Sequence, residues 1–148
     1  MPFESKKPGP SGLVWNAETM KMTKILLIED DVQMRSMLSE VLQRNNFDVY
    51  EAQDGKIGEE ICKKVDFDLV ITDIIMPNQE GLETIMILRH YHPKLKIIAM
   101  SGGGSAGPDV FLEMASELGA DKMLAKPFMQ KELLAAIKEV LGEGKSPG

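Results

Sequence analysis

The sequence is poor in cysteine and histidine, with one cysteine and two histidines among 148 residues. The single cysteine, Cys62, cannot form a disulfide within the chain. It has no cysteine or histidine neighbour at the spacing of a metal site, so we expect a small buried helix residue rather than a metal ligand or a nucleophile. These shortages exclude a disulfide-stapled domain and a metal site built from cysteine and histidine.

Basic residues are outnumbered, and long apolar runs are missing. The formal net charge is -6, and neutralising nucleic-acid phosphates requires a basic face, so we expect no direct nucleic-acid contact by this chain. No apolar run approaches the roughly 20 residues that span a bilayer. The basic pair Lys6-Lys7 is followed by Pro-Gly-Pro rather than by the apolar part of a signal peptide. We therefore expect a cytoplasmic protein that makes no membrane contact.

The remaining composition is typical of one globular domain with tails, since 43% of the residues are hydrophobic and 27% are charged. Residues 1–22 contain several prolines and glycines and show little periodicity, which predicts a disordered leader or an added expression tail. Residues 23–142 are predicted to form the folded domain. Residues 143–148, rich in glycine, are predicted to be a second disordered tail.

Apolar segments with strand character alternate five times with segments of helical periodicity. The expected strands are Lys24–Ile28, Phe47–Ala52, Asp68–Thr72, Lys96–Met100 and Asp121–Ala125. Helices are expected after Asp31, near Ile57, and over about Leu82–Tyr91, Pro108–Leu118 and Gln130–Leu141. The third helix is predicted to bury Leu82, Ile85, Met86 and Leu88. The alternation predicts an α/β fold, a doubly wound five-stranded parallel sheet with helices on both faces.

The third strand ends in an acidic residue, Asp73. A buried apolar run, Leu69–Thr72, leads into it, and Met76-Pro77 prevents the strand from continuing as a paired element. In an open α/β sheet, ligands bind outside the carboxyl ends of the strands. The sequence therefore places Asp73 in a binding crevice, although an isolated aspartate at such a position more often caps a helix or begins a turn.

Polar residues also end the other central strands. Glu29 and Asp30 follow the first strand, Ser101 the fourth and Lys126 the fifth. Three carboxylates in one crevice repel each other unless a cation binds them, and Mg²⁺ suits oxygen ligands of this kind. Lys126 supplies a positive charge for a phosphoryl oxygen, and Ser101 supplies a hydroxyl donor. These parts predict phosphoryl transfer to a carboxylate nucleophile, Asp73, with an aspartyl phosphate as the product.

The chain resembles the CheY-like receiver domain of bacterial two-component response regulators over about Thr23–Leu141. The matching residues are Ile25–Asp30, Asp73 with Met76-Pro77 and Gly81, Ser101-Gly102, Gly119–Asp121, and Lys126–Phe128. The resemblance implies a flavodoxin-like sheet in 2-1-3-4-5 order. It also implies a cis Lys126-Pro127 peptide bond, the isomer that is essentially confined to proline.

The resemblance further assigns a role to each polar residue. Asp73 is the expected phosphoacceptor, and Ser101 and Lys126 are expected to contact the phosphoryl group. The expected Mg²⁺ site comprises the acidic pair Glu29 and Asp30, with Asp73 and the backbone carbonyl of Ile75. The expected partners are a histidine kinase or histidine phosphotransfer protein and an unidentified downstream protein or output domain. Such a domain is not an enzyme in the usual sense, because it catalyses only its own phosphorylation and dephosphorylation.

Two other functions remain open from the residues alone. A flavodoxin-like cofactor-binding protein would share the fold, but Glu29 and Asp30 would repel a flavin phosphate. A Mg²⁺-dependent phosphatase with an aspartyl nucleophile would carry an Asp-x-Asp pair after the first strand, and this chain has none there. One position departs from the receiver pattern: Met123 stands where receivers usually place tyrosine or phenylalanine on the fifth strand, which puts the usual aromatic switch in doubt.

Overall fold

The computed structural model describes residues 22–74, 81–102 and 108–142. Five parallel strands form one sheet in the order β2-β1-β3-β4-β5. The strands are β1 (Lys24–Ile28), β2 (Asp48–Ala52), β3 (Leu69–Asp73), β4 (Lys96–Ser101) and β5 (Lys122–Ala125). The helices are α1 (Val32–Arg44), α2 (Gly55–Cys62), α3 (Gly81–Tyr91), α4 (Pro108–Leu118) and α5 (Gln130–Leu141). The fold class and the 2-1-3-4-5 order are confirmed.

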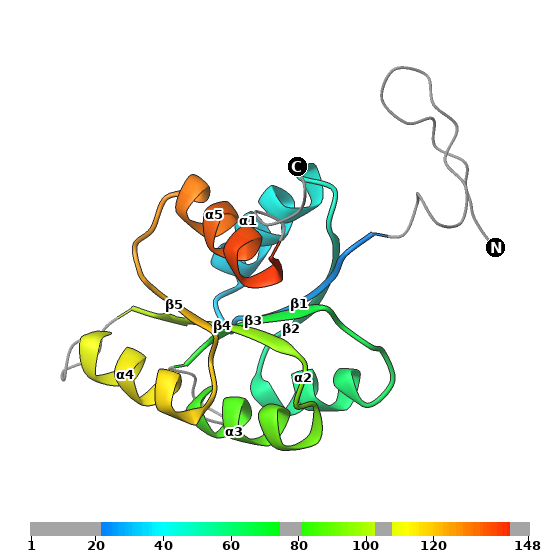
Figure 1. Cartoon of the computed structure of the whole chain (residues 1–148). Coiled ribbons are helices and arrows are strands. Elements are labelled where there is room, and N and C mark those ends of the chain that lie inside the picture. Colours follow the sequence, from blue (N-terminus) through cyan, green and yellow to red (C-terminus); the bar gives the residue numbers. More distant parts are fainter. Residues whose placement is uncertain (1–21, 75–80, 103–107, 143–148) are drawn as a thin grey trace.

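The sheet is the middle layer of three. Helices α1 and α5 cover one face, and α2, α3 and α4 cover the other (Figure 1). Alternate residues of β1 serve the two faces: Ile25 and Leu27 pack with the α1 and α5 side chains, and Leu26 and Ile28 pack with the core on the α2, α3 and α4 side. A strand that is buried on both faces consists of consecutive apolar residues, and these strands are therefore recognisable in the sequence.

The helix boundaries follow from local signals. Asp31, at the start of α1, accepts a hydrogen bond from the backbone N–H of Met34 at 3.0 Å, and Asp54 caps α2 through Ile57 in the same way at 2.9 Å. Each carboxylate pairs with a backbone donor that the first turn of a helix leaves unpaired. Asp31 therefore serves the helix, and α1 begins directly behind Glu29 and Asp30.

The prediction that α3 buries Met86 is wrong, because its side chain is 50% exposed. Leu82, Ile85 and Leu88 share one side of the helix and are buried, as expected. Met86 follows Ile85 directly, and a step of one residue turns the side chain by about 100° around the axis. It therefore lies beyond the edge of the apolar stripe. Cys62, by contrast, is buried at the end of α2, as predicted.

Further observations complete the fold. The Lys126-Pro127 peptide bond is cis, as the resemblance implied. No helix among the described residues is long and apolar enough to cross a membrane. The two predicted tails, residues 1–22 and 143–148, lie outside the described residues except for Met22, so their predicted disorder stays a prediction.

Candidate phosphoryl-transfer site

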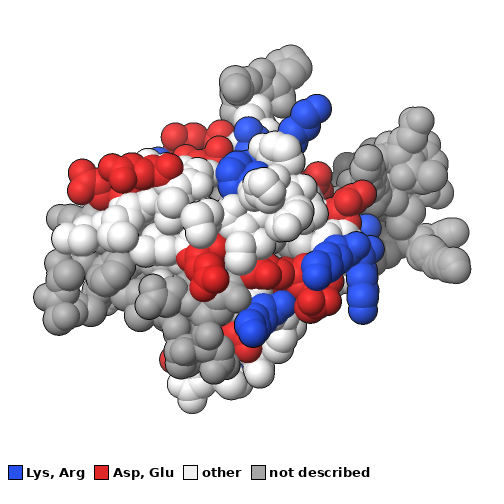
Figure 2. All heavy atoms as spheres, turned by 90° about the horizontal axis from the view of Figure 1, so that it is seen from below, with Lys and Arg blue, Asp and Glu red and all other residues white. Residues whose placement is uncertain are grey.

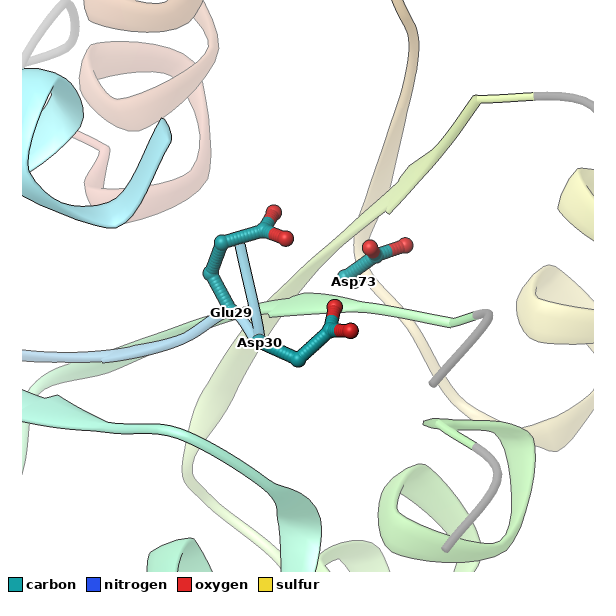
Figure 3. A group of neighbouring side chains, drawn as sticks. All are labelled: Glu29, Asp30 and Asp73. Atoms are coloured by element: carbon teal, nitrogen blue, oxygen red, sulfur yellow. The ribbon is translucent and has the colours of Figure 1, made fainter. Parts of the chain in front are cut away.

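Three carboxylates gather where β1 and β3 end (Figure 3). One carboxylate oxygen from each of Glu29, Asp30 and Asp73 lies within 4.8 Å of the others. Glu29 and Asp73 are buried, with 1% and 5% of their surface exposed, whereas Asp30 is exposed. The neighbouring strands β1 and β3 are parallel, so their carboxyl ends lie at one edge of the sheet, and the expected convergence of these three residues is present.

Lys126 brings a positive charge to this cluster. Its Nζ donates to Glu29 Oε1 at 3.0 Å and to Asp73 Oδ2 at 3.2 Å. The residue directly follows β5, and its backbone N–H donates to the carbonyl of Ser101 at 2.8 Å. This bond continues the pairing of β5 with β4, so the sheet itself sets where the lysine side chain begins. The predicted meeting of Lys126 with the acidic residues is therefore present.

The single positive charge in the cluster does not balance the negative charges of its carboxylates. Burial raises the pKa of Glu29, and the negative charge of Asp73 raises it further, against the opposing effect of Lys126. Burial alone would lower the pKa of Lys126, but the charges of Asp73 and Glu29 outweigh it and the pKa lies above its ordinary value. One ammonium thus faces two buried carboxylates and a third at the surface. A cation would relieve the remaining repulsion.

The donor set fits a hard divalent cation. Three carboxylate groups with oxygens this close together can share one ion, and oxygen is the ligand that Mg²⁺ and Ca²⁺ prefer. The small number of carboxylates favours Mg²⁺, which keeps several waters when it binds. The expected fourth ligand, the carbonyl of Ile75, lies outside the described residues.

Glu29 is held from two further directions. The backbone N–H of Asp31 donates to Glu29 Oε2 at 3.1 Å, and Arg35 donates from Nη1 to the backbone carbonyl of Glu29 at 2.7 Å. Arg35 also contacts Glu51 on β2, with 3.3 Å between Nε and Oε1. This role of Arg35 is not among the predictions from the sequence. A signal was present, because a cation in the first turn of a helix is disfavoured by the helix dipole and therefore suggests a specific partner.

Ser101 and Gly81 border the cluster. Ser101 is the last residue of β4 and is fully buried. Gly81, the first residue of α3, packs so closely on the end of β3 that a Cβ atom there would overlap the backbone oxygen of Asp73 and the Cα atom of Ile74. Only glycine allows α3 to begin at this place without moving Asp73.

Met123 lies on β5 opposite Ala99 of β4 and is half-buried against the core between the sheet and α2, α3 and α4. Ser101 lies two residues further along β4, opposite Ala125.

Known proteins resemble this chain in both sequence and fold. The family described as response regulator receiver domain matches residues 25–138. The chain belongs to this family. The transcriptional regulatory protein CpxR of Escherichia coli (strain K12) is 37% identical over 120 residues, which cover 81% of this chain and 50% of CpxR. The chain therefore spans about half the length of such relatives.

Solved receiver structures agree with the fold. A CheY-like response regulator receiver domain protein from Methanospirillum hungatei JF-1 superposes with a TM-score of 0.77 at 26% identity, covering 86% of this chain and 100% of that one. The response regulator TrrA of Thermotoga maritima, solved in complex with Mg²⁺-BeF, gives a TM-score of 0.71 at 29% identity, covering 80% and 99%.

Membership of the receiver family decides between the functions that the residues alone left open. The domain is a receiver of two-component signalling, and neither the cofactor-binding protein nor the phosphatase is favoured. The expectation that this chain makes no nucleic-acid contact is not borne out, since relatives such as CpxR are transcriptional regulators.

Proposed function

We propose that this receiver accepts a phosphoryl group on Asp73. The observation that carries the proposal is the meeting of Asp73 with Glu29, Asp30 and Lys126 at one edge of the sheet. An Asp73 carboxylate oxygen attacks phosphorus, and an oxygen–phosphorus bond forms. The bond from phosphorus to the donor breaks, and the donor atom keeps its electron pair. The donor is a phosphohistidine of a kinase or phosphotransfer protein, or a small acyl phosphate.

Lys126 has two functions in this step. Before transfer, its ammonium group pairs with Asp73 and partly offsets the charge of the carboxylates. After attack begins, the same group lies beside the nucleophilic oxygen, where a phosphoryl oxygen arrives, and it can stabilise the charge there. Glu29 accepts from the same ammonium and so holds it in place when Asp73 turns to the phosphoryl group.

Glu29, Asp30 and Asp73 would hold Mg²⁺, together with the Ile75 carbonyl that the receiver resemblance implies. Bound there, the ion supplies positive charge for the phosphoryl oxygens. The donor set and the Mg²⁺-BeF complex of TrrA support this choice of cation. Ser101, buried at the end of β4, is the hydroxyl we expect to contact the phosphoryl group.

We further propose that the chain catalyses only its own phosphorylation and the hydrolysis of its aspartyl phosphate, in the cytoplasm. Its signal would pass to an output domain or a separate protein, as in a longer regulator of the CpxR kind. In that arrangement, phosphorylation of the receiver would control the activity of the output domain or of the separate protein.

The test is incubation with acetyl phosphate and Mg²⁺, followed by intact-mass measurement. One hydroxylamine-labile phosphoryl group is expected on the native protein and none on Asp73→Asn. Asp66→Asn is the matched control, because Asp66 is an exposed aspartate that contributes no oxygen to the acidic cluster. Equal labelling of the Asp73→Asn protein would refute the proposal.

A further inference from the structure

Three exposed apolar side chains lie on the outer surface of two adjacent helices. Met86 on α3 is 50% exposed, and Val110 and Met114 on α4 are 45% and 44% exposed. Scattered exposed apolar residues are ordinary on any protein, but a shared patch of them indicates a contact surface. We call Met86, Val110 and Met114 the α3–α4 patch.

Helix geometry indicates where these three side chains lie on their helices. Arg89 lies three residues after Met86, on the same side of α3, and its Nη2 donates to the carbonyl of Gly119, just after α4, at 2.7 Å. Met86 is therefore on the side of α3 that is nearer to α4, and the two helices pack side by side (Figure 1). On α4, Val110 and Met114 are four residues apart and so lie one above the other.

The exposed charged residues that α3 and α4 place near the patch are glutamates. Glu83 on α3 and Glu113 and Glu117 on α4 are exposed. Arg89 is the single lysine or arginine of the two helices, and its guanidinium group is bound to backbone carbonyls and to Asp121. The view onto the face that carries α2, α3 and α4 shows a broad area of uncharged residues with acidic groups along its edge, and basic groups also lie beside it (Figure 2).

We propose that the α3–α4 patch binds an amphipathic helix whose apolar side contacts Met86, Val110 and Met114 and whose lysine and arginine residues face the glutamates. Such a helix satisfies both properties of the surface, the exposed apolar groups and the negative rim. Methionine side chains are unbranched and adapt to the shape of a partner. A second copy of this chain is a poor occupant, because a symmetric contact would set the same glutamates against each other.

The probe is a fluorescein-labelled 18-residue peptide of leucine and lysine in helical periodicity, with a scrambled peptide of the same composition as the control. Fluorescence anisotropy should show saturable binding of the helical peptide and at least tenfold weaker binding of the scrambled one. Met86→Ser with Met114→Ser should weaken binding at least about tenfold, because both truncations remove apolar contact area. Glu113→Gln with Glu117→Gln should weaken it and reduce its dependence on salt.

Two controls make the result decisive. Met37→Ser removes a methionine that is equally exposed, at 49%, but lies on α1 across the sheet, and it should leave the affinity unchanged. Melting curves and circular dichroism should show that every variant is folded, and ¹⁵N amide shifts on peptide binding should concentrate on α3 and α4. Equal binding of the scrambled peptide, no loss on the double methionine substitution, or a dimer in sedimentation that the same substitution dissociates would each overturn the proposal.

Discussion

Gly81 packs directly against the backbone of Asp73, so that a Cβ atom on Gly81 would overlap the Asp73 carbonyl oxygen. Gly81→Ala should therefore shift either α3 or the proposed nucleophile. We expect a loss of about 1–3 kcal/mol in the free energy of unfolding, the usual cost of overpacking, together with slower phosphorylation by acetyl phosphate. Gly102→Ala is the control, because its Cβ would lie 3.4 Å from the flexible Lys126 side chain. Equal behaviour of the two variants would contradict the packing argument.

Arg89 joins α3 to the two segments that follow α3 and α4. It donates to the carbonyls of Pro93 and Leu95 at 2.8 and 2.7 Å and to Gly119 and Asp121 at 2.7 and 3.0 Å. Arg89→Ala leaves several partly buried acceptors without a donor. We therefore expect the free energy of unfolding, measured by urea denaturation, to fall by about 2–4 kcal/mol.

Arg44 provides the comparison for Arg89. It forms one exposed ion pair, with Glu40 four residues earlier on the same helix. Arg44→Ala should cost less than about 0.5 kcal/mol. Similar losses in the free energy of unfolding for the two arginine substitutions would show that the backbone contacts of Arg89 stabilise the fold no more than an exposed ion pair does.

Mg²⁺ should stabilise the folded domain, because it binds where three carboxylates repel each other. At about 100 times its dissociation constant, a ligand specific to the folded state adds about 2.7 kcal/mol. Asp30→Asn should abolish most of this gain, whereas Asp31→Asn should retain it, because asparagine also caps helices and Asp31 serves α1. Melting temperatures measured with and without Mg²⁺ test the difference. A gain that survives Asp30→Asn would exclude the shared ion.

Cys62 should make stability depend on alkaline pH. Burial, followed by the charge of Glu59, raises the pKa of its thiol from 9.0 to about 11. The unfolded chain then loses this proton at lower pH than the folded chain, so the contribution to stability is constant below about pH 9 and falls as pH rises towards 11. The free energy of unfolding of native protein relative to Cys62→Ala should fall by about 2 kcal/mol across this range.

Urea unfolding at a series of pH values measures the Cys62 effect. Iodoacetamide at pH 8 should also modify the folded protein far more slowly than the unfolded one, because the thiolate is the reactive form and the thiol is buried. A pH-independent difference between native protein and Cys62→Ala would contradict the raised pKa.

Much of the fold could be predicted because its strands are buried on both faces. The apolar runs Lys24–Ile28 and Leu69–Thr72 are continuous for that reason, and the residues that end them mark one edge of the sheet. Glu29, Asp73 and Lys126 could therefore be brought together from the sequence, although the residues of each pair are far apart along the chain.

The remaining features depend on contacts whose partners no pattern in the sequence identifies. The carbonyl partners of Arg35 and Arg89 are backbone atoms, and any residue could supply them, so the sequence does not identify the partners of either arginine. Met86 is apolar and adjacent to the buried stripe, and only the packing of α3 shows that it lies outside that stripe. Periodicity predicts which side of a helix is apolar but does not locate the edge of the contact.

The role of Asp73 as phosphoacceptor is tested most directly by locating the phosphoryl group. After incubation with acetyl phosphate and Mg²⁺, borohydride reduction converts an aspartyl phosphate to homoserine, and tandem mass spectrometry of the peptides identifies the modified position. Homoserine is expected at position 73 alone, and none is expected after Asp73→Asn or when Mg²⁺ is omitted. Homoserine at position 30, or a label that persists in the Asp73→Asn protein, would contradict this role of Asp73.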